Sequence, residues 1–290
     1  MTWARCALAA VLFAVLAAAG TARAQGGAAP FDHTHADWTA LLARNVVEID
    51  EGRASRARYA GFARDRAALG AYLARLSRVE PAEFEGWTRA QRMAFLINAY
   101  NAFTVEKVLT RYPDLRSIRD FGRFVGNPFR DRFFTLIGRP TSLDDIEHGM
   151  LRKPGAYDDV RVHFALNCAS IGCPMLRHEA YAADRLADQL EDQARRFLSD
   201  RSRNRLDPKG GALQVSRIFD WFEEDFQRGT RNFDGRGAAV ESRGGFLAHY
   251  AKLLADEAAA QERIAAQRAP IEFLEYDWTL NDAGSAPPKR

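Results

Sequence analysis

A long apolar run in the first half of the chain places the strongest constraint on its fold. The run begins at Thr88, where Gln91 three residues later completes the pattern of a capping box, and it ends before Pro113. Its large apolar side chains occupy most sides of a helix: Met93, Phe95, Leu96, Ile97, Tyr100, Phe103, Val105, Val108 and Leu109. A helix that is apolar nearly all round is stable only when other elements cover it. We therefore predict a buried helix here.

Apolar spacing elsewhere predicts further helices and short strands. Helical spacing covers residues 37–50, 64–76, 143–151, 184–198, 216–226 and 242–260. Strand patterns cover residues 133–137, 160–166, 205–206, 212–215 and 271–276. Four aromatic residues at helical spacing are typical of core: Phe219, Trp221, Phe222 and Phe226. The sum predicts an α+β fold, a helix-dominated single domain with a small, mainly antiparallel sheet.

The first residues have the pattern of a signal peptide, residues 1–24. Arg5 precedes an apolar run over residues 7–19, and Ala22-Arg23-Ala24 forms a cleavage site of small residues. The run is shorter than the ~20 residues that span a bilayer, and no other segment approaches that length. We expect an exported protein, periplasmic in a bacterium, with no membrane span.

Composition fits one globular domain. Hydrophobic residues make up 47% and charged residues 27% of the chain, as in ordinary globular proteins. We predict a disordered N-terminus over residues 25–31, a single globular domain over residues 32–282 and a disordered tail over residues 283–290. The net charge of +3 is too small to indicate a nucleic-acid partner.

The segment around residues 160–174 has the chemistry expected of a site. Apolar and polar residues alternate up to Asn167, which predicts a half-buried strand that carries His163. A loop of small residues follows and holds Cys168 and Cys173, the two cysteines left after removal of the signal peptide. In an oxidising compartment these two favour a disulfide, provided that the loop brings their Cα atoms to ~5.5 Å.

The same residues allow two other interpretations. As a nucleophile, Cys168 needs a base, and a strand would hold His163 ~16 Å away, so His148 is the first choice. As zinc ligands, Cys168 and Cys173 would join His163 and His148, although the cysteine spacing exceeds that of a usual zinc knuckle. Apart from this zinc alternative we expect no cofactor.

Two asparagines lie on one face of the buried helix. Asn98 and Asn101 are three residues apart, and a buried amide without partners costs roughly 1–3 kcal/mol. They either line the site and orient a catalytic imidazole, or tie the helix to a loop backbone. Glu147 and His148 are neighbours in sequence on a short predicted helix. Their side chains therefore point about 100° apart, and each needs a partner of its own.

Five blocks of residues together resemble the domain-of-unknown-function family 547. They are residues 95–102, 142–152, 163–174 with Arg177, 215–226 and 276–281. The resemblance covers about residues 80–281 and departs from the family at Ala169, where a glycine is frequent. It implies that one shared feature contains Asn98, Asn101, Glu147, His148, His163, Asn167 and Cys168.

These observations leave three functions open. The first is a thiol-dependent hydrolase or acyl/amide transferase, with Cys168 as nucleophile, His148 or His163 as base and Asn98 or Asn101 as the orienting amide. Further residues would bind the substrate: Glu147, Asn167, Ser170, Arg152 and Cys173. The second is a non-enzymatic module that binds a small-molecule or peptide ligand beside a Cys168–Cys173 disulfide. The third is a zinc site.

Overall fold

The protein is described by a computed structural model, in which residues 30–122, 127–209, 211–228, 232–234 and 241–284 are placed. The predicted signal peptide lies outside these residues. Phe31 begins the compact unit and packs edge-on against Phe95, with 5.3 Å between ring centroids. At the other end the Ala283 amide donates to Ala57 O at 2.9 Å. Phe31 and Ala283 lie in the two segments that the sequence analysis predicts to be disordered.

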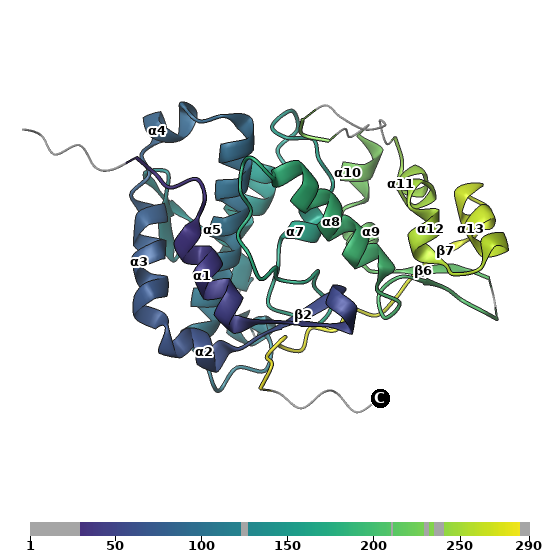
Figure 1. Ribbon diagram of the computed structural model, residues 1–290, viewed down its shortest axis with the longest axis horizontal. Coiled ribbons are helices and arrows are strands. Elements are labelled where there is room, and N and C mark those ends of the chain that lie inside the picture. Colours follow the sequence, from purple (N-terminus) through teal and green to yellow (C-terminus); the bar gives the residue numbers. More distant parts are fainter. Residues whose placement is uncertain (1–29, 123–126, 210, 229–231, 235–240, 285–290) are drawn as a thin grey trace, which may run out of the picture. The chain divides into compact units, whose positions relative to one another are not determined.

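The described residues form the predicted α+β fold, with helices in the majority (Figure 1). The strands make three small sheets rather than one: β1 (Val46–Ile49) with β2 (Ala54–Ala57), β3 (Phe134–Leu136) with β4 (Arg139–Thr141), and β5 (Arg205–Leu206), β6 (Leu213–Val215) and β7 (Ile271–Phe273). All pairs are antiparallel except β6–β7, which is parallel.

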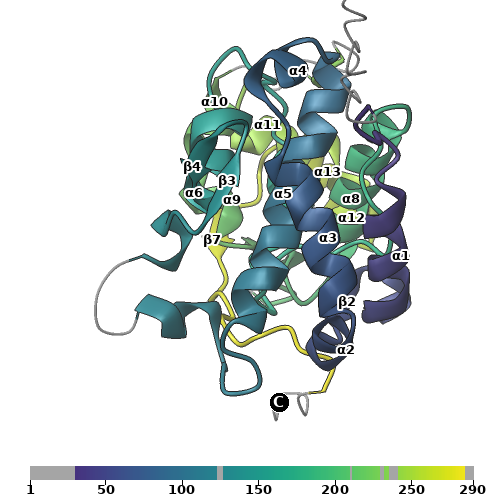
Figure 2. The same ribbon diagram turned by 90° about the vertical axis from the view of Figure 1, so that its left-hand side faces the viewer.

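The buried helix is confirmed as α5 (Arg89–Leu109). The amide of Gln91 donates to Thr88 Oγ1 at 3.2 Å, and the Thr88 amide donates to Gln91 Oε1 at 2.9 Å, so the predicted capping box is complete. From Met93 onward nearly every side chain of α5 is buried. Figure 2 shows α5 behind α3, with α1 beside them.

The other helices include shorter pieces of the predicted ones, together with helices that the sequence analysis did not predict. Around α5 lie α1 (Ala36–Asn45), α2 (Tyr59–Arg64), α3 (Arg66–Ser77), α4 (Pro81–Glu85) and α6 (Leu143–Ile146), which continues as a π-helical turn (Glu147–Leu151). Later in the chain come α7 (Val162–Ala165), α8 (Leu186–Ser199), α9 (Ile218–Trp221), α10 (Glu223–Gln227), α11 (Arg243–His249), α12 (Ala251–Leu254) and α13 (Ala258–Ala265). The helices that the sequence analysis did not predict are α2, α4 and α7. Short 3₁₀ turns cover Asp50–Gly52, Ile118–Gly122 and Pro128–Arg130.

Two sequence predictions about local structure are wrong. The predicted helix over residues 37–50 ends at Asn45, because a run rich in β-branched residues follows and pairs as β1. The predicted strand over residues 160–166 is a turn followed by α7. Asp159 explains the difference: its carboxylate accepts the Arg161 amide at 3.0 Å and starts a helical turn. Every residue from Asp159 to Asn167 is buried, so the alternation in the sequence does not mark a solvent face.

Large side chains form two hydrophobic clusters. One surrounds α5 and contains Phe95, Tyr100 and Leu166. The other contains Phe164, Phe219 and residues of α8 to α12. The segment 162–166 contributes to both clusters, so it lies where they meet.

Asn98 and Asn101 tie α5 to the loops beside it. Asn98 Nδ2 donates to Tyr181 O at 2.7 Å and Asn98 Oδ1 accepts from the Tyr181 amide at 3.0 Å. Asn101 Nδ2 donates to Ala165 O at 3.0 Å and Asn101 Oδ1 accepts from the Asn167 amide at 2.9 Å. Each side chain satisfies one backbone donor and one acceptor. Of the two alternatives, these bonds fit the one in which the amides tie the helix to a loop backbone. Among the described residues no imidazole bonds either amide.

We predict that Asn101→Ala destabilises the fold by about 2–4 kcal/mol, because it leaves the buried Ala165 carbonyl and Asn167 amide without partners. Urea denaturation measures the loss. Gln227→Ala, a truncation at an exposed position of α10, is the control and should stay within about 0.5 kcal/mol of the parent protein. A parent-like stability for Asn101→Ala would contradict the structural role.

Candidate functional site

A cavity of about 170 Å³ lies at the junction of the two hydrophobic clusters. Its walls come from α5, from the turn after α6, from the loop that follows α7, from α9 and from the segment after β7. Aromatic side chains dominate these walls: Tyr100, Phe129, Trp221, Phe222, Tyr276 and Trp278. The carboxylate and imidazole side chains of the lining are Asp144, Glu147, His148 and His163.

Three of the aromatic rings form a continuous wall. The ring centroids of Trp221 and Tyr276 are 4.8 Å apart, and those of Tyr276 and Trp278 are 4.6 Å apart. The Trp221 side chain is 45% exposed, the one large hydrophobic residue so exposed in the described part of the chain. A large exposed aromatic residue at the edge of a cavity is typical of a binding site. The prediction that Trp221 belongs to the core is therefore wrong, whereas Phe219 and Phe226 are core residues and Phe222 packs against them.

The predicted disulfide between Cys168 and Cys173 is present, with an S–S distance of 2.17 Å and Cα atoms 6.1 Å apart. Asn167 shapes its loop, since Asn167 Oδ1 accepts the Ala169 amide at 3.0 Å and Nδ2 donates to Pro174 O at 2.8 Å. Ala169 adopts a left-handed φ of 63°, a conformation that glycine would adopt without strain.

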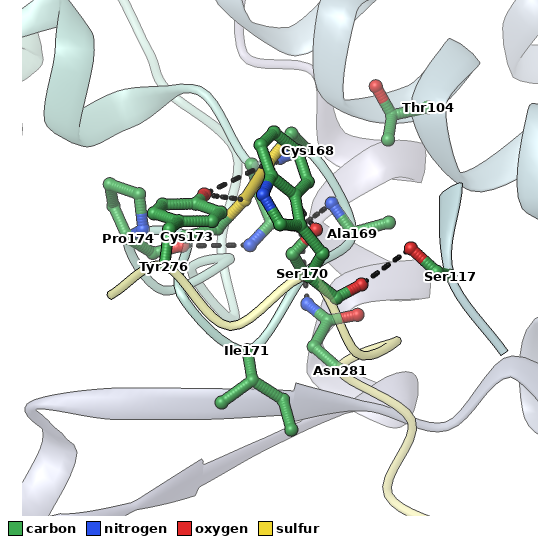
Figure 3. Close-up of a disulfide and its surroundings, with 12 residues drawn as sticks. Thr104, Ser117, Cys168, Ala169, Ser170, Ile171, Cys173, Pro174, Tyr276 and Asn281 are labelled. Atoms are coloured by element: carbon green, nitrogen blue, oxygen red, sulfur yellow. Dashed lines mark hydrogen bonds between the residues drawn. A yellow bond between two sulfur atoms is a disulfide. The ribbon is translucent and has the colours of Figure 1, made fainter. Parts of the chain in front are cut away.

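Tyr276 contacts both sulfur atoms of the disulfide (Figure 3). Its hydroxyl lies 3.2 Å from Cys168 Sγ and 3.2 Å from Cys173 Sγ. Burial raises the pKa of Tyr276 well above its ordinary value, so the hydroxyl keeps its proton and can donate it. Ser170 is almost fully buried, and its Oγ lies 3.8 Å from Cys168 Sγ. The polar side chains around Cys168 are thus hydroxyls.

His163 pairs with Asp225, which the sequence analysis did not single out. Nε2 of His163 lies 2.7 Å from Asp225 Oδ2, and the imidazole stacks on Phe222 with 4.1 Å between ring centroids. Burial, with a smaller effect of the Arg152 charge, lowers the pKa of His163 to about 3. The imidazole is therefore neutral and donates its Nε2 proton to the carboxylate. Its buried Nδ1 has no hydrogen-bond partner among the described residues.

Arg152 lies behind the cavity and holds Asp225. Its Nε donates to Asp225 Oδ2 at 2.5 Å, and its guanidinium lies 4.5 Å from the Phe222 ring centroid and also bonds His148 Nδ1. Arg228 pairs with the same carboxylate. The charge of Asp225 is thus balanced by two arginines, which explains why His163 stays neutral beside it. On the other side of His148, Nε2 lies 3.4 Å from Asp144 Oδ1.

The charge of Glu147 acts on Arg152, but Glu147 forms no ion pair with a described residue. The carboxylate is half-buried in the cavity lining, and no Lys, Arg or His nitrogen lies within 4.0 Å of it among the described residues. Its hydrogen-bond partner is the hydroxyl of Tyr100. Burial is the main cause of the raised pKa of Tyr100, and the negative charge of Glu147 raises that pKa further.

The structure separates the predicted site residues into two groups. Five line the cavity: Glu147, His148, His163, Cys168 and Cys173. The others position the lining from outside it: Asn98, Asn101, Arg152, Asn167 and Ser170. The sequence analysis missed Tyr100, Tyr276 and Trp278 as lining residues. Their only signal was membership of the blocks that carry the family resemblance.

The zinc alternative finds no support in the described part of the chain. The two sulfurs bond each other and are not available as ligands. The described residues also contain no group of three or more His, Cys, Asp or Glu side chains arranged to hold a metal ion.

None of the helices placed in the structure has the length and apolarity needed to cross a membrane.

Residues 84–198 match the model of a family described as "Protein of unknown function, DUF547". This segment is a DUF547 family domain. The match confirms the resemblance over a shorter range than residues 80–281. No curated protein and no solved structure matches the chain. The DUF547 segment supplies the acidic, imidazole and disulfide lining, while Trp221, Tyr276 and Trp278 come from beyond it.

We predict that protein stability falls as the pH drops from about 6.5 toward 3. An unfolded histidine has a pKa near 6.5, whereas folded His163 has one of about 3, so within this window only the unfolded chain binds the proton. The slope that one such residue adds is at most about 1.4 kcal/mol per pH unit. Urea denaturation across this pH range measures it.

Two variants test whether His163 causes this dependence of stability on pH. His163→Gln keeps a hydrogen-bond donor for Asp225 but does not titrate, and His249→Gln makes the same change at an exposed position. His163→Gln should flatten the slope, and His249→Gln should not. Equal slopes for His163→Gln and the parent would show that His163 protonates in the folded state as it does in the unfolded chain.

We predict that Ala169→Gly lowers the free energy of unfolding less than Ala165→Gly does, by about 1 kcal/mol or more. Both changes remove a buried methyl group. At Ala169 the glycine also relieves a left-handed conformation, which costs an L-residue about 1–2 kcal/mol, whereas within α7 it adds about 1 kcal/mol of helix destabilisation. Denaturation midpoints give the comparison, and a reversed order would mean that Ala169 is unstrained.

Proposed function

We propose that the protein binds a small organic cation in the aromatic cavity, as a ligand-binding module with a disulfide in its wall. One observation carries this proposal: the half-buried Glu147 carboxylate lies in the lining without an ion-pair partner among the described residues. A carboxylate removed from water is stabilised by a positive charge placed next to it. Aromatic faces attract the same kind of ligand through their negative electrostatic potential.

The volume of the cavity limits the ligand. An apolar cavity of roughly 150 Å³ accepts a benzene molecule, and this one measures about 170 Å³. A ligand of that size is a single small ring or a short branched amine. Of the two ligand types predicted from the sequence, the small molecule is therefore favoured over the peptide.

The paired cysteines favour binding over thiol-dependent hydrolysis. In this form Cys168 has no thiolate, and its polar side-chain neighbours are Ser170 and Tyr276 rather than an imidazole. The hydrolase or transferase stays a prediction for a reduced form. The disulfide also supports the export that the N-terminal pattern predicts, since disulfides persist in oxidising compartments such as the periplasm.

Benzylamine and benzyl alcohol test the proposal, because they have nearly the same shape and differ in charge at neutral pH. Isothermal titration calorimetry should show benzylamine binding at least about tenfold more tightly. Glu147→Gln should remove most of this preference, since a hydrogen bond to a charged group contributes about 1.5–3 kcal/mol and 1.4 kcal/mol is tenfold.

The control is Glu262→Gln, which makes the same charge change at an exposed position of α13. It should bind benzylamine like the parent. Equal affinity of the two ligands for the parent protein, or an unchanged preference in Glu147→Gln, would overturn the proposal.

A further inference from the structure

The two sulfur atoms of the disulfide have different environments. Both cysteines line the cavity, yet Cys168 is half-buried whereas Cys173 is only 2% exposed. A thiol that enters the cavity from solvent therefore meets Cys168 first. Thiol–disulfide exchange depends on which sulfur is attacked and on how well the other sulfur leaves as a thiolate.

Cys173 is the sulfur equipped to leave. The backbone amide of Cys168 donates to Cys173 Sγ at 2.9 Å, and the Tyr276 hydroxyl lies 3.2 Å from the same atom. Donors aimed at a sulfur stabilise its thiolate and make it a better leaving group. The buried Tyr276 hydroxyl keeps its proton at neutral pH, so it remains a donor while the negative charge develops.

Hydrogen bonds hold the loop in place in addition to the disulfide. The Ile171 amide donates to Thr279 O at 2.8 Å and the Gly172 amide donates to Asp277 O at 2.8 Å, which fixes the loop to the segment after β7. The Asn101 and Asn167 side chains hold the residues on its other side. Opening the sulfur–sulfur bond would therefore leave the cavity wall in place.

From these three observations we propose that the Cys168–Cys173 disulfide is a reactive group that oxidises a small thiol bound in the cavity. The thiolate of the ligand attacks Cys168 Sγ and forms a mixed disulfide, and the bonding electrons leave with Cys173 Sγ as a thiolate. A second ligand thiolate then attacks the ligand sulfur of the mixed disulfide. It releases the ligand disulfide, so two thiols are oxidised and the protein becomes a dithiol.

The cavity also indicates the class of thiol. Glu147 lies in the same lining as Cys168, so a short molecule with an ammonium group and a thiol would reach both. This assignment of an aminothiol rests on the proposed function. The reactivity of the disulfide does not, because it depends on Cys168, Cys173 and Tyr276 alone.

Three small thiols of different charge test the proposal on the folded, oxidised protein: cysteamine, 2-mercaptoethanol and mercaptoacetate. Each is compared at equal thiolate concentration, and each rate is divided by the rate of the same thiol with the denatured protein. Acid quenching and peptide mass spectrometry locate the adduct. We expect the first adduct on Cys168 and the largest rate ratio for cysteamine.

Tyr276→Phe tests the leaving group. Removal of a hydrogen bond to a developing thiolate should slow adduct formation by about tenfold to a hundredfold. Tyr250→Phe is the control, since it deletes a hydroxyl that bonds Glu191 away from the cavity, and it should react at the parent rate. Thermal unfolding of both variants checks that they remain folded at the assay temperature.

Four outcomes would overturn parts of the inference separately. Reaction only after denaturation, or a first adduct on Cys173, would overturn the reactive disulfide. A parent-like rate in folded Tyr276→Phe would overturn the leaving-group role of Cys173. Equal rate ratios for the three thiols would overturn the aminothiol assignment alone. Benzylamine binding is measured without thiol chemistry. The binding proposal can therefore fail or hold independently of the reactive disulfide and of the leaving-group role of Cys173.

Discussion

The structure depends on two side-chain amides within an apolar helix. α5 is buried along nearly its whole length from Met93 onward, yet hydrophobic packing does not fix which loop lies against which turn. Asn98 and Asn101 do so, because each bonds both a backbone carbonyl and a backbone amide of a loop. The loop that begins at Asn167 is positioned in this way, and with it the disulfide.

The cavity exists because two hydrophobic clusters meet without filling the space between them. Leu166 belongs to one cluster and Ile218 to the other, and both line the cavity. The polar groups at this boundary are held by partners outside it. Asp225, for instance, is balanced by Arg152 and Arg228 and keeps the neutral His163 in one orientation. Glu147 forms no such ion pair among the described residues, and the proposed binding of a cation rests on this difference.

Local patterns in the sequence were sufficient for much of the fold. The capping box at Thr88, the strands β5 and β6, and the helix that begins at Leu143 are all confirmed, because short-range hydrogen bonds and turn residues determine them. The strand expected to carry His163 was wrong for a reason that spacing does not reveal. Asp159 turns the chain locally, and burial on every side removes the polar face that alternation implies.

The sequence by itself determined which residues are chemically unusual: two amides on an apolar helix, two cysteines in a short loop, and Glu147 and His148 on a capped turn. For the two cysteines the sequence left a disulfide, a nucleophile and zinc ligands open, and the tertiary structure shows the disulfide. Only the tertiary structure decided which of these residues share a cavity and which support it. Asp225, Tyr276 and Trp278 approach from distant parts of the chain, and contacts at such separations arise from packing rather than from local sequence.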